Sequence, residues 1–145
     1  MMNRWQKLLC VVAMLAFTGL VQAALVVEGG HVRALLPGVA STAAYMTLRN
    51  TGTTELLLTA VSSPAAAKVT LHNTMNHNGM LHMMDMQMLA IPAGGQVVFE
   101  SGGMHLMLEE ISGPLEPGTE VELTLQFANG ENEIITLPVR SVLDE

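Results

Sequence analysis

Four side chains in the second half of the sequence have the chemistry and the spacing of a metal site. They are His72, Met83, His105 and Met107, which together read His-x10-Met-x21-His-x-Met. The set contains two imidazoles and two thioethers, and neither a thiolate nor a carboxylate. Soft, neutral donors of this kind favour Cu(I) over metal ions that prefer oxygen ligands. The pattern therefore predicts a Cu(I) site.

The distribution of methionine supports this interpretation. Nine of the 12 methionines follow residue 23, and eight of these nine lie between Met75 and Met107. Methionine used as a flexible core filler would be spread over many strands. Instead, four further donors lie between His72 and Met83, and they leave open whether a second copper ion binds there. These donors are Met75, His77, Met80 and His82.

The N-terminus predicts export. Two basic residues precede an uncharged, mostly apolar run, Leu8–Leu20, which is shorter than the ~20 apolar residues that a membrane span needs. Small residues follow, so we expect a signal peptide over residues 1–23, cleaved near Ala23, and a periplasmic protein. Cys10, the only cysteine, begins the apolar run rather than following it. This position argues against a lipid attached at that cysteine.

The predicted mature domain, residues 24–145, contains no cysteine and is acidic. It has four basic residues against 13 acidic ones, which gives a net charge of −9. Nucleic acid is excluded as a partner because its phosphates must be neutralised by Lys and Arg. A blue-copper electron-transfer site is also excluded, because it requires a cysteine sulfur. We expect no membrane span in this part of the chain.

Short β-type runs separated by Gly, Pro and Asn predict a single-domain antiparallel β-sandwich or barrel. Pro138 lacks an amide donor and predicts that the last strand lies at an edge or carries a bulge. The expected strands are Leu25–Glu28, Ala43–Asn50, Glu55–Val61, Lys68–His72, Met83–Ile91, Gln96–Glu100, Met104–Leu108, Thr119–Phe127 and Glu133–Arg140.

These strands must bring the four donors together. In a strand, His105 and Met107 share one face and lie ~7 Å apart. We expect His72 at the end of its strand and Met83 at the start of the next one, after a loop that contains Asn78-Gly79. Two strand ends and one strand pair would then meet at a rim of the domain.

The stretch from Val69 to Leu108 resembles the periplasmic copper chaperones of the PCuAC type, whose signature is His-x10-Met-x21-His-x-Met. Segments such as Ile91–Gly95 and Gly102–Leu108 are also similar to that family. The resemblance implies a cupredoxin-like β-sandwich that binds one Cu(I) and supplies it for respiratory oxidase assembly. The chain departs from the family at His31, where many members carry tryptophan.

Several functions stay open at this point. A copper carrier without catalytic turnover fits best. Its partner would be a copper acceptor protein, such as a cytochrome c oxidase subunit or its assembly factor. A copper-sequestering or resistance protein would use the same ligands, and a copper-dependent redox enzyme would need ligands that also stabilise Cu(II). We expect His31 at a rim or on the surface.

Overall fold

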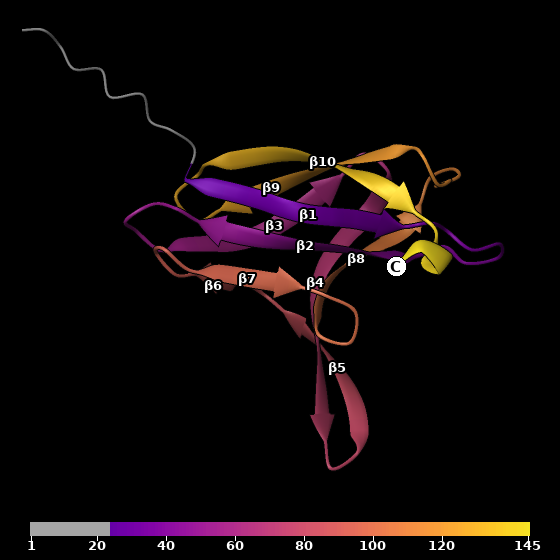
Figure 1. The fold of residues 1–145 in the computed structure, drawn as a ribbon, viewed down its shortest axis with the longest axis horizontal. Helices are drawn as coiled ribbons and strands as arrows, with labels where there is room; N and C mark the ends of the chain where they lie inside the picture. Colours follow the sequence, from indigo (N-terminus) through magenta and orange to yellow (C-terminus); the bar gives the residue numbers. More distant parts are fainter. Residues whose placement is uncertain (1–23) are drawn as a thin grey trace, which may run out of the picture.

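The structure, a computed structural model, describes residues 24–145, and this part of the chain is all β apart from one turn of 3-10 helix (Figure 1). The predicted signal peptide and Cys10 lie outside the described residues. Between residues 24 and 145, no helix is long and apolar enough to cross a membrane. The elements are β1 (Leu25–Arg33), β2 (Thr42–Asn50), β3 (Leu56–Ser63), β4 (Ala66–His77), β5 (Met80–Met86), β6 (Leu89–Ile91), β7 (Gln96–Phe99), β8 (Met104–Ile111), β9 (Glu120–Phe127), β10 (Asn132–Arg140) and η1 (Val142–Asp144).

Seven of these strands close into a barrel. Hydrogen-bonded neighbours follow the order β4-β8-β2-β1-β10-β9-β3, and a further pairing between β3 and β4 closes the ring. Each of these pairs is antiparallel except β1–β10. The other strands extend the ring from outside, β5 on β4, β6 on β3 and β7 on β2. The predicted all-β architecture, an antiparallel barrel, is confirmed apart from the one parallel pair.

The core of the barrel comes from strict alternation along the strands. In β9, Val121, Leu123, Leu125 and Phe127 are buried, and the residues between them are exposed or half-buried. Burying one such side chain stabilises the fold by about 1.5–3 kcal/mol. Leucines of β4 and β8 also point inward, Leu71 lying opposite Leu106 in the ladder. The residues that alternate with these leucines therefore lie on the outer face of the barrel.

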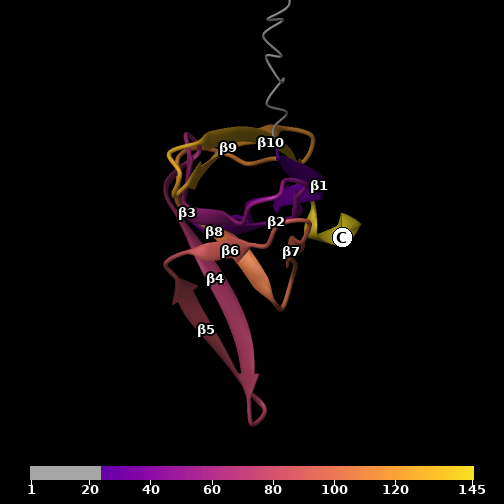
Figure 2. The ribbon, with the colours of Figure 1, turned by 90° about the vertical axis from the view of Figure 1, so that its left-hand side faces the viewer.

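Strands β4 and β5 continue beyond the barrel as a two-stranded hairpin (Figures 1 and 2). Strand β4 pairs with β8 only from Ala66 to Asn73. Residues 75–82, here called the outer hairpin, pair only with one another, and each of them is exposed. Asn78 and Gly79 form the turn, with φ of 52° and 83°. Positive φ at both central residues is the mark of a type I′ turn, which Asn-Gly favours.

This hairpin corrects two expectations about the strands. The strand predicted to end at His72 continues to His77, and the strand predicted over Met83–Ile91 divides into β5 and β6. His72 is therefore inside β4 rather than at its end, and Met83 is inside β5 rather than at its start. The physical reason is the tight Asn78-Gly79 turn. It lets the residues before and after it, which were expected to form a loop, pair with one another as two strands.

The predicted edge position of the last strand is also wrong. Strand β10 pairs with β9 along most of its length and lies between β9 and β1. Its ladder with β1 involves only Val139 and Arg140, the two residues that follow Pro138. Because proline has no amide hydrogen to donate, the closure of the barrel on this side begins only after Pro138.

Candidate metal centre

The two predicted histidine ligands lie side by side on neighbouring strands. In the order β5-β4-β8, His72 of β4 is directly opposite Asp85 on one side and directly opposite His105 on the other. The centres of the two imidazole rings are 5.5 Å apart and the ring planes are nearly perpendicular. His105 is 6% exposed. The pair therefore forms a largely enclosed centre on the outer face of the barrel.

The two methionine ligands lie on the same face, one on each side of the histidine pair. Met83 is opposite Thr74, and Met107 is opposite Thr70. Since paired residues project to the same face, and alternate residues of a strand share it, both thioethers emerge beside His72. Met83 and Met107 are nevertheless separated by β4. The structure thus brings the histidines together and places the two thioethers at either side of them.

Hydrogen bonds orient the His105 ring. Its Nδ1 lies 3.1 Å from the carbonyl oxygen of Gly103. A carbonyl oxygen only accepts, so Nδ1 carries the hydrogen and donates it. Nε2 of the neutral ring is then the atom with a free lone pair. A bond of this kind at the other ring nitrogen is the usual way in which a metal-binding histidine is held.

The His72 ring is held at its opposite nitrogen. Its Nε2 lies 2.8 Å from Oδ1 of Asp85 and 3.0 Å from the hydroxyl of Thr70. Since a carboxylate accepts, Nε2 is the protonated atom. The Thr70 hydroxyl in turn lies 3.3 Å from Oε2 of Glu109, to which it donates. A chain of polar contacts therefore fixes the ring from one side.

The remaining nitrogen of His72, Nδ1, is buried and has no hydrogen-bond partner among the described residues. Leaving a buried polar atom unsatisfied costs about 1–3 kcal/mol. In a neutral ring whose hydrogen is on Nε2, this atom carries a lone pair. An electron-pair acceptor, such as a metal ion, would satisfy it.

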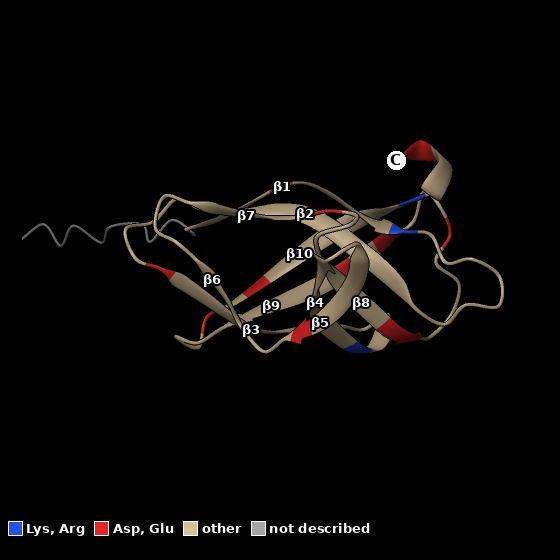
Figure 3. Ribbon diagram, turned by 90° about the horizontal axis from the view of Figure 1, so that it is seen from below, with Lys and Arg blue, Asp and Glu red and all other residues tan. Residues whose placement is uncertain are grey.

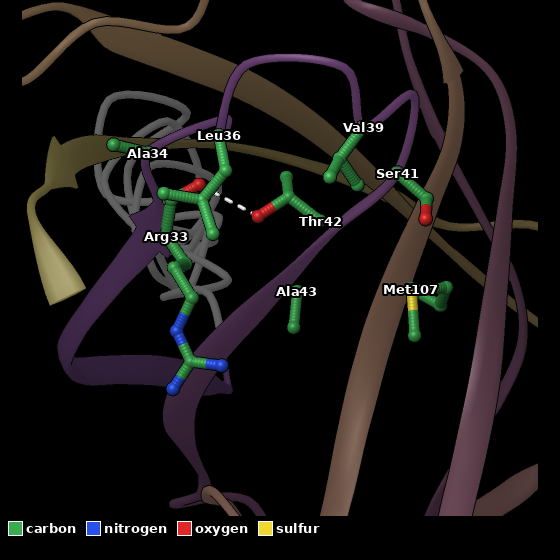
Figure 4. A pocket seen from close by; sticks show the side chains of 8 residues that line it. All are labelled: Arg33, Ala34, Leu36, Val39, Ser41, Thr42, Ala43 and Met107. Atoms are coloured by element: carbon green, nitrogen blue, oxygen red, sulfur yellow. Dashed lines mark hydrogen bonds between the residues drawn. The ribbon is translucent and has the colours of Figure 1, made fainter.

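The thioethers differ in exposure. Met83 is 56% exposed, and it lies where the hairpin leaves the barrel. Met107 is half-buried. It also lines a pocket of about 240 Å³, with Arg33 on the opposite side of the opening (Figure 4). One thioether is thus open to solvent, and the other is half-buried in the lining of a pocket.

Harder donors do not form an alternative site. Among residues 24–145, no three His, Cys, Asp or Glu side chains are arranged to hold a metal ion. A metal ion held by His72 and His105 would therefore need further ligands, for which the thioethers of Met83 and Met107 lie on the same face. Thioether ligands favour Cu(I) over zinc, calcium or magnesium.

His31 belongs to a different cluster. Its Nε2 lies 2.8 Å from Oε1 of Glu145, and its ring packs against Tyr45 at 5.3 Å. Arg33 donates to the same carboxylate at 2.6 Å and lowers the pKa of Glu145 to about 2. In turn, the hydrogen bond to Glu145 raises the pKa of Arg33. His31 therefore anchors the final turn η1 to β1.

The extra donors of the His72–Met83 segment do not join the centre. Met75 lies opposite His82, and His77 lies opposite Met80, so these four occupy the other face of the hairpin. The sequence groups these four donors only by their proximity in the chain. It also did not predict the contact of His72 with Asp85, although counting back from the Asn78-Gly79 turn would have paired the two residues.

The fold is that of a PCuAC-type, cupredoxin-like barrel. The copper-bound PCuAC domain from PmoF2 superposes with a TM-score of 0.69 at 24% identity, covering 81% of this chain and 93% of that domain. DR1885 from Deinococcus radiodurans, solved in its Cu(I) form, has a TM-score of 0.68 at 31% identity, with 84% and 81% covered. Its apo form matches with a TM-score of 0.65.

Residues 25–139 match the family model described as "Putative lipoprotein LpqE-like", and the chain belongs to this family. It is 34% identical over 104 residues to "Putative lipoprotein Lxx21020" of Leifsonia xyli subsp. xyli, and 28% identical over 102 residues to RP573 of Rickettsia prowazekii. These matches cover 71% and 70% of this chain but only 63% and 56% of the two relatives. The word lipoprotein in the family description points to an exported protein. The cysteine to which a lipid could be attached, Cys10, lies outside the described residues.

Proposed function

We propose that the chain is a copper chaperone that holds Cu(I) through His72, Met83, His105 and Met107 and passes it to an acceptor protein. The observation that carries this proposal is the histidine pair on the outer face of the barrel. The two rings are adjacent, each is held at one nitrogen, and the other nitrogen of His72 is buried without a partner.

The Cu(I) form of DR1885 supports the choice of ion. That protein is 31% identical to this chain over most of both lengths. The donor chemistry leads independently to the same ion, because two thioethers and two imidazoles form a soft, neutral set. Bound Cu(I) would be the cargo of the protein, and the domain itself would catalyse no reaction.

The exposed thioether suits release of the cargo. Met83 is the most exposed of the four donors and lies in β5 at the base of the outer hairpin, whereas His105 is buried. In ligand exchange, an acceptor would replace the accessible thioether first, while the enclosed imidazoles still hold the ion. Thioethers also survive an oxidising compartment without forming disulfides.

The same proposal includes export and a partner. Residues 1–23 would act as a signal peptide, and residues 24–145 would form the copper-binding domain in the periplasm. The acceptor would be a protein of the copper-centre assembly of cytochrome c oxidase. The soft site and its open side are the features that such transfer requires.

A competition titration tests the ligand assignment. The purified mature chain, the ligand variants and a control variant at another methionine would compete for Cu(I) with a chromophoric chelator. His105→Ala and Met107→Ala should each weaken the affinity at least tenfold, about 1.4 kcal/mol. Met88→Leu removes another exposed methionine, which lies outside β5, and should leave the affinity unchanged.

Two results would overturn the assignment. One is an unchanged affinity when each of the four ligands is replaced in turn. The other is an equal loss in Met88→Leu, because this would show that any exposed methionine contributes and that the centre is not specific.

A further inference from the structure

The outer hairpin carries a second set of donors that the candidate centre does not use. Of its eight residues, Met75, His77, Met80 and His82 offer thioethers or imidazoles. All four are exposed, Met75 by 48% and Met80 by 64%. Methionine is usually buried in folded proteins. Its exposure here, on a hairpin that packs against nothing beyond itself, needs an explanation other than core packing.

The register of the hairpin gathers these donors on one face. Met75 is directly opposite His82, and His77 is directly opposite Met80. The pair between them, Asn76 and Leu81, projects to the other face. Each thioether therefore has an imidazole across the ladder and another one next to it along its own strand.

The distances within this face suit a single ion. Cβ atoms of directly opposite residues are ~4.5–5.5 Å apart. Alternate residues along one strand are ~7 Å apart. The four side chains thus leave the backbone from the corners of a small rectangle. Imidazole and thioether side chains are long enough to converge above its centre.

The turn fixes this arrangement. Asn78 and Gly79 close the hairpin with two residues, so the neighbouring pair His77 and Met80 cannot slip in register. The side-chain oxygen of Asn76 also accepts a hydrogen bond of 2.9 Å from the amide of Gly79. The positions of the four donors therefore follow from local sequence and do not depend on the barrel.

This face is the outward continuation of the barrel interior. On the same face, Leu71 pairs with Met86, and both pack in or against the core. Beyond the barrel, apolar side chains give way to the Met and His donors. The outer hairpin contains no charged residue, and seen end-on it carries neither acidic nor basic colouring at its tip (Figure 3). Without a carboxylate, the face suits a soft monovalent ion better than zinc or calcium.

We propose that Met75, His77, Met80 and His82 form a second Cu(I) site on the outer hairpin. It shares no ligand with the centre of His72 and His105 and lies on the opposite face of the same two strands. The proposal goes beyond the proposed function and does not depend on it. A chain with both sites carries two copper ions.

A titration that resolves single methionines tests this proposal. The full mature chain, labelled at its methionine methyl groups, would be titrated with Cu(I) and with Ag(I), a soft ion of the same charge. Signals of Met75 and Met80 should shift together in one binding event, and those of Met83 and Met107 in another. Met46, which is 3% exposed in the core, provides the internal control and should not move.

Variants separate the two sites. Met75→Leu/His77→Gln/Met80→Leu/His82→Gln should reduce the copper content from two equivalents to one. His72→Ala/His105→Ala should also leave one equivalent, which is now the one that shifts Met75 and Met80. If only the proposed function were wrong, the histidine variant would keep the wild-type stoichiometry while the hairpin variant still lost one equivalent.

Three results would overturn the second site. They are a single equivalent in the wild-type chain that shifts only Met83 and Met107, signals of Met75 and Met80 that do not move with either ion, and two equivalents in the hairpin variant. The titration of the wild-type chain decides the question even if a variant fails to fold.

Discussion

The barrel and the outer hairpin use apolar side chains in opposite ways. In the barrel, leucines such as Leu125 are fully buried, and their packing holds the fold. In the outer hairpin, Leu81 is 71% exposed, and its methionines pack against nothing beyond their own two strands. The comparison teaches that hydrophobic content alone does not identify a core. Thioethers on an open ribbon are better explained as ligands, and the candidate centre lies where the two regions meet.

The largest expected effect is the difference in stability between two leucine-to-alanine variants, one in the barrel and one in the outer hairpin. Leu125→Ala removes a fully buried side chain of β9 and should destabilise the protein by about 2–5 kcal/mol. Leu81→Ala removes the same atoms from the outer hairpin and should change stability by about 0.5 kcal/mol or less. Chemical denaturation of both variants measures the difference. If both variants lost the same unfolding free energy, Leu81 would have to be packed as tightly as Leu125, and the difference between hairpin and barrel would not hold.

The barrel could be predicted from the sequence because its signals are local. The alternation of Val121, Leu123, Leu125 and Phe127 sets the buried face of a strand without reference to any other strand. The His-x-Met spacing likewise put His105 and Met107 on one face. Residue type and spacing sufficed for both features.

The rest required the pairing of strands. The unpartnered Nδ1 of His72 cannot be read from spacing, and the contact of His72 with Asp85 follows only once Asn78-Gly79 is known to be a two-residue turn. The position of His72 was predicted at a strand end because the polar segment after it looks like a loop. The Asn78-Gly79 turn changes this outcome by letting exposed residues form a ladder that no core supports.

Asp85→Asn tests how the centre is held. The carboxylate accepts from Nε2 of His72, and losing such a partner of a ligating histidine typically weakens metal affinity by about 10–100-fold. Because Asp85 is 71% exposed, we expect the Cu(I) affinity to fall by about tenfold, the lower end of this range. The number of bound ions should not change. Asp144→Asn, a surface change on η1, is the control. A Cu(I) titration in which Asp85→Asn matches wild type would show that Asp85 does not position the ring.

Gly79→Ala tests whether the turn sets the outer hairpin alone. Gly79 has a φ of 83°, and an added Cβ would meet nothing within 4 Å, so the effect is backbone strain only. Left-handed backbone costs a residue other than glycine about 1–2 kcal/mol. Hydrogen exchange should quicken at residues 75–82, while the midpoint of global unfolding stays the same. A lower global midpoint would show that the hairpin and the barrel unfold together.

The smallest effect concerns the C-terminal turn η1, where Glu145 joins Arg33 and His31. The pKa of Glu145 is lowered to about 2 from its ordinary value of 4.5, so the folded state binds a proton less readily than the unfolded state. Its contribution is therefore complete above pH 4.5 and is lost as the pH falls towards 2. Near the surface, we expect about 1 kcal/mol or less. Glu145→Gln should lower stability at pH 6 and have a much smaller effect at pH 2, as followed by thermal unfolding. If Glu145→Gln and the wild-type chain were equally stable at pH 6, the ion pair would make no contribution and this prediction would be wrong.

X-ray absorption at the copper edge tests the central claim most directly, namely that the outer face of β4, β5 and β8 binds Cu(I) through imidazoles and thioethers. The sample is the chain with one equivalent of Cu(I) and with the four hairpin donors replaced, so that only the candidate centre remains. The account predicts both nitrogen and sulfur neighbours, with fewer sulfur neighbours in Met107→Ala and fewer nitrogen neighbours in His72→Ala. A first shell without sulfur, or one that neither substitution changes, would contradict it.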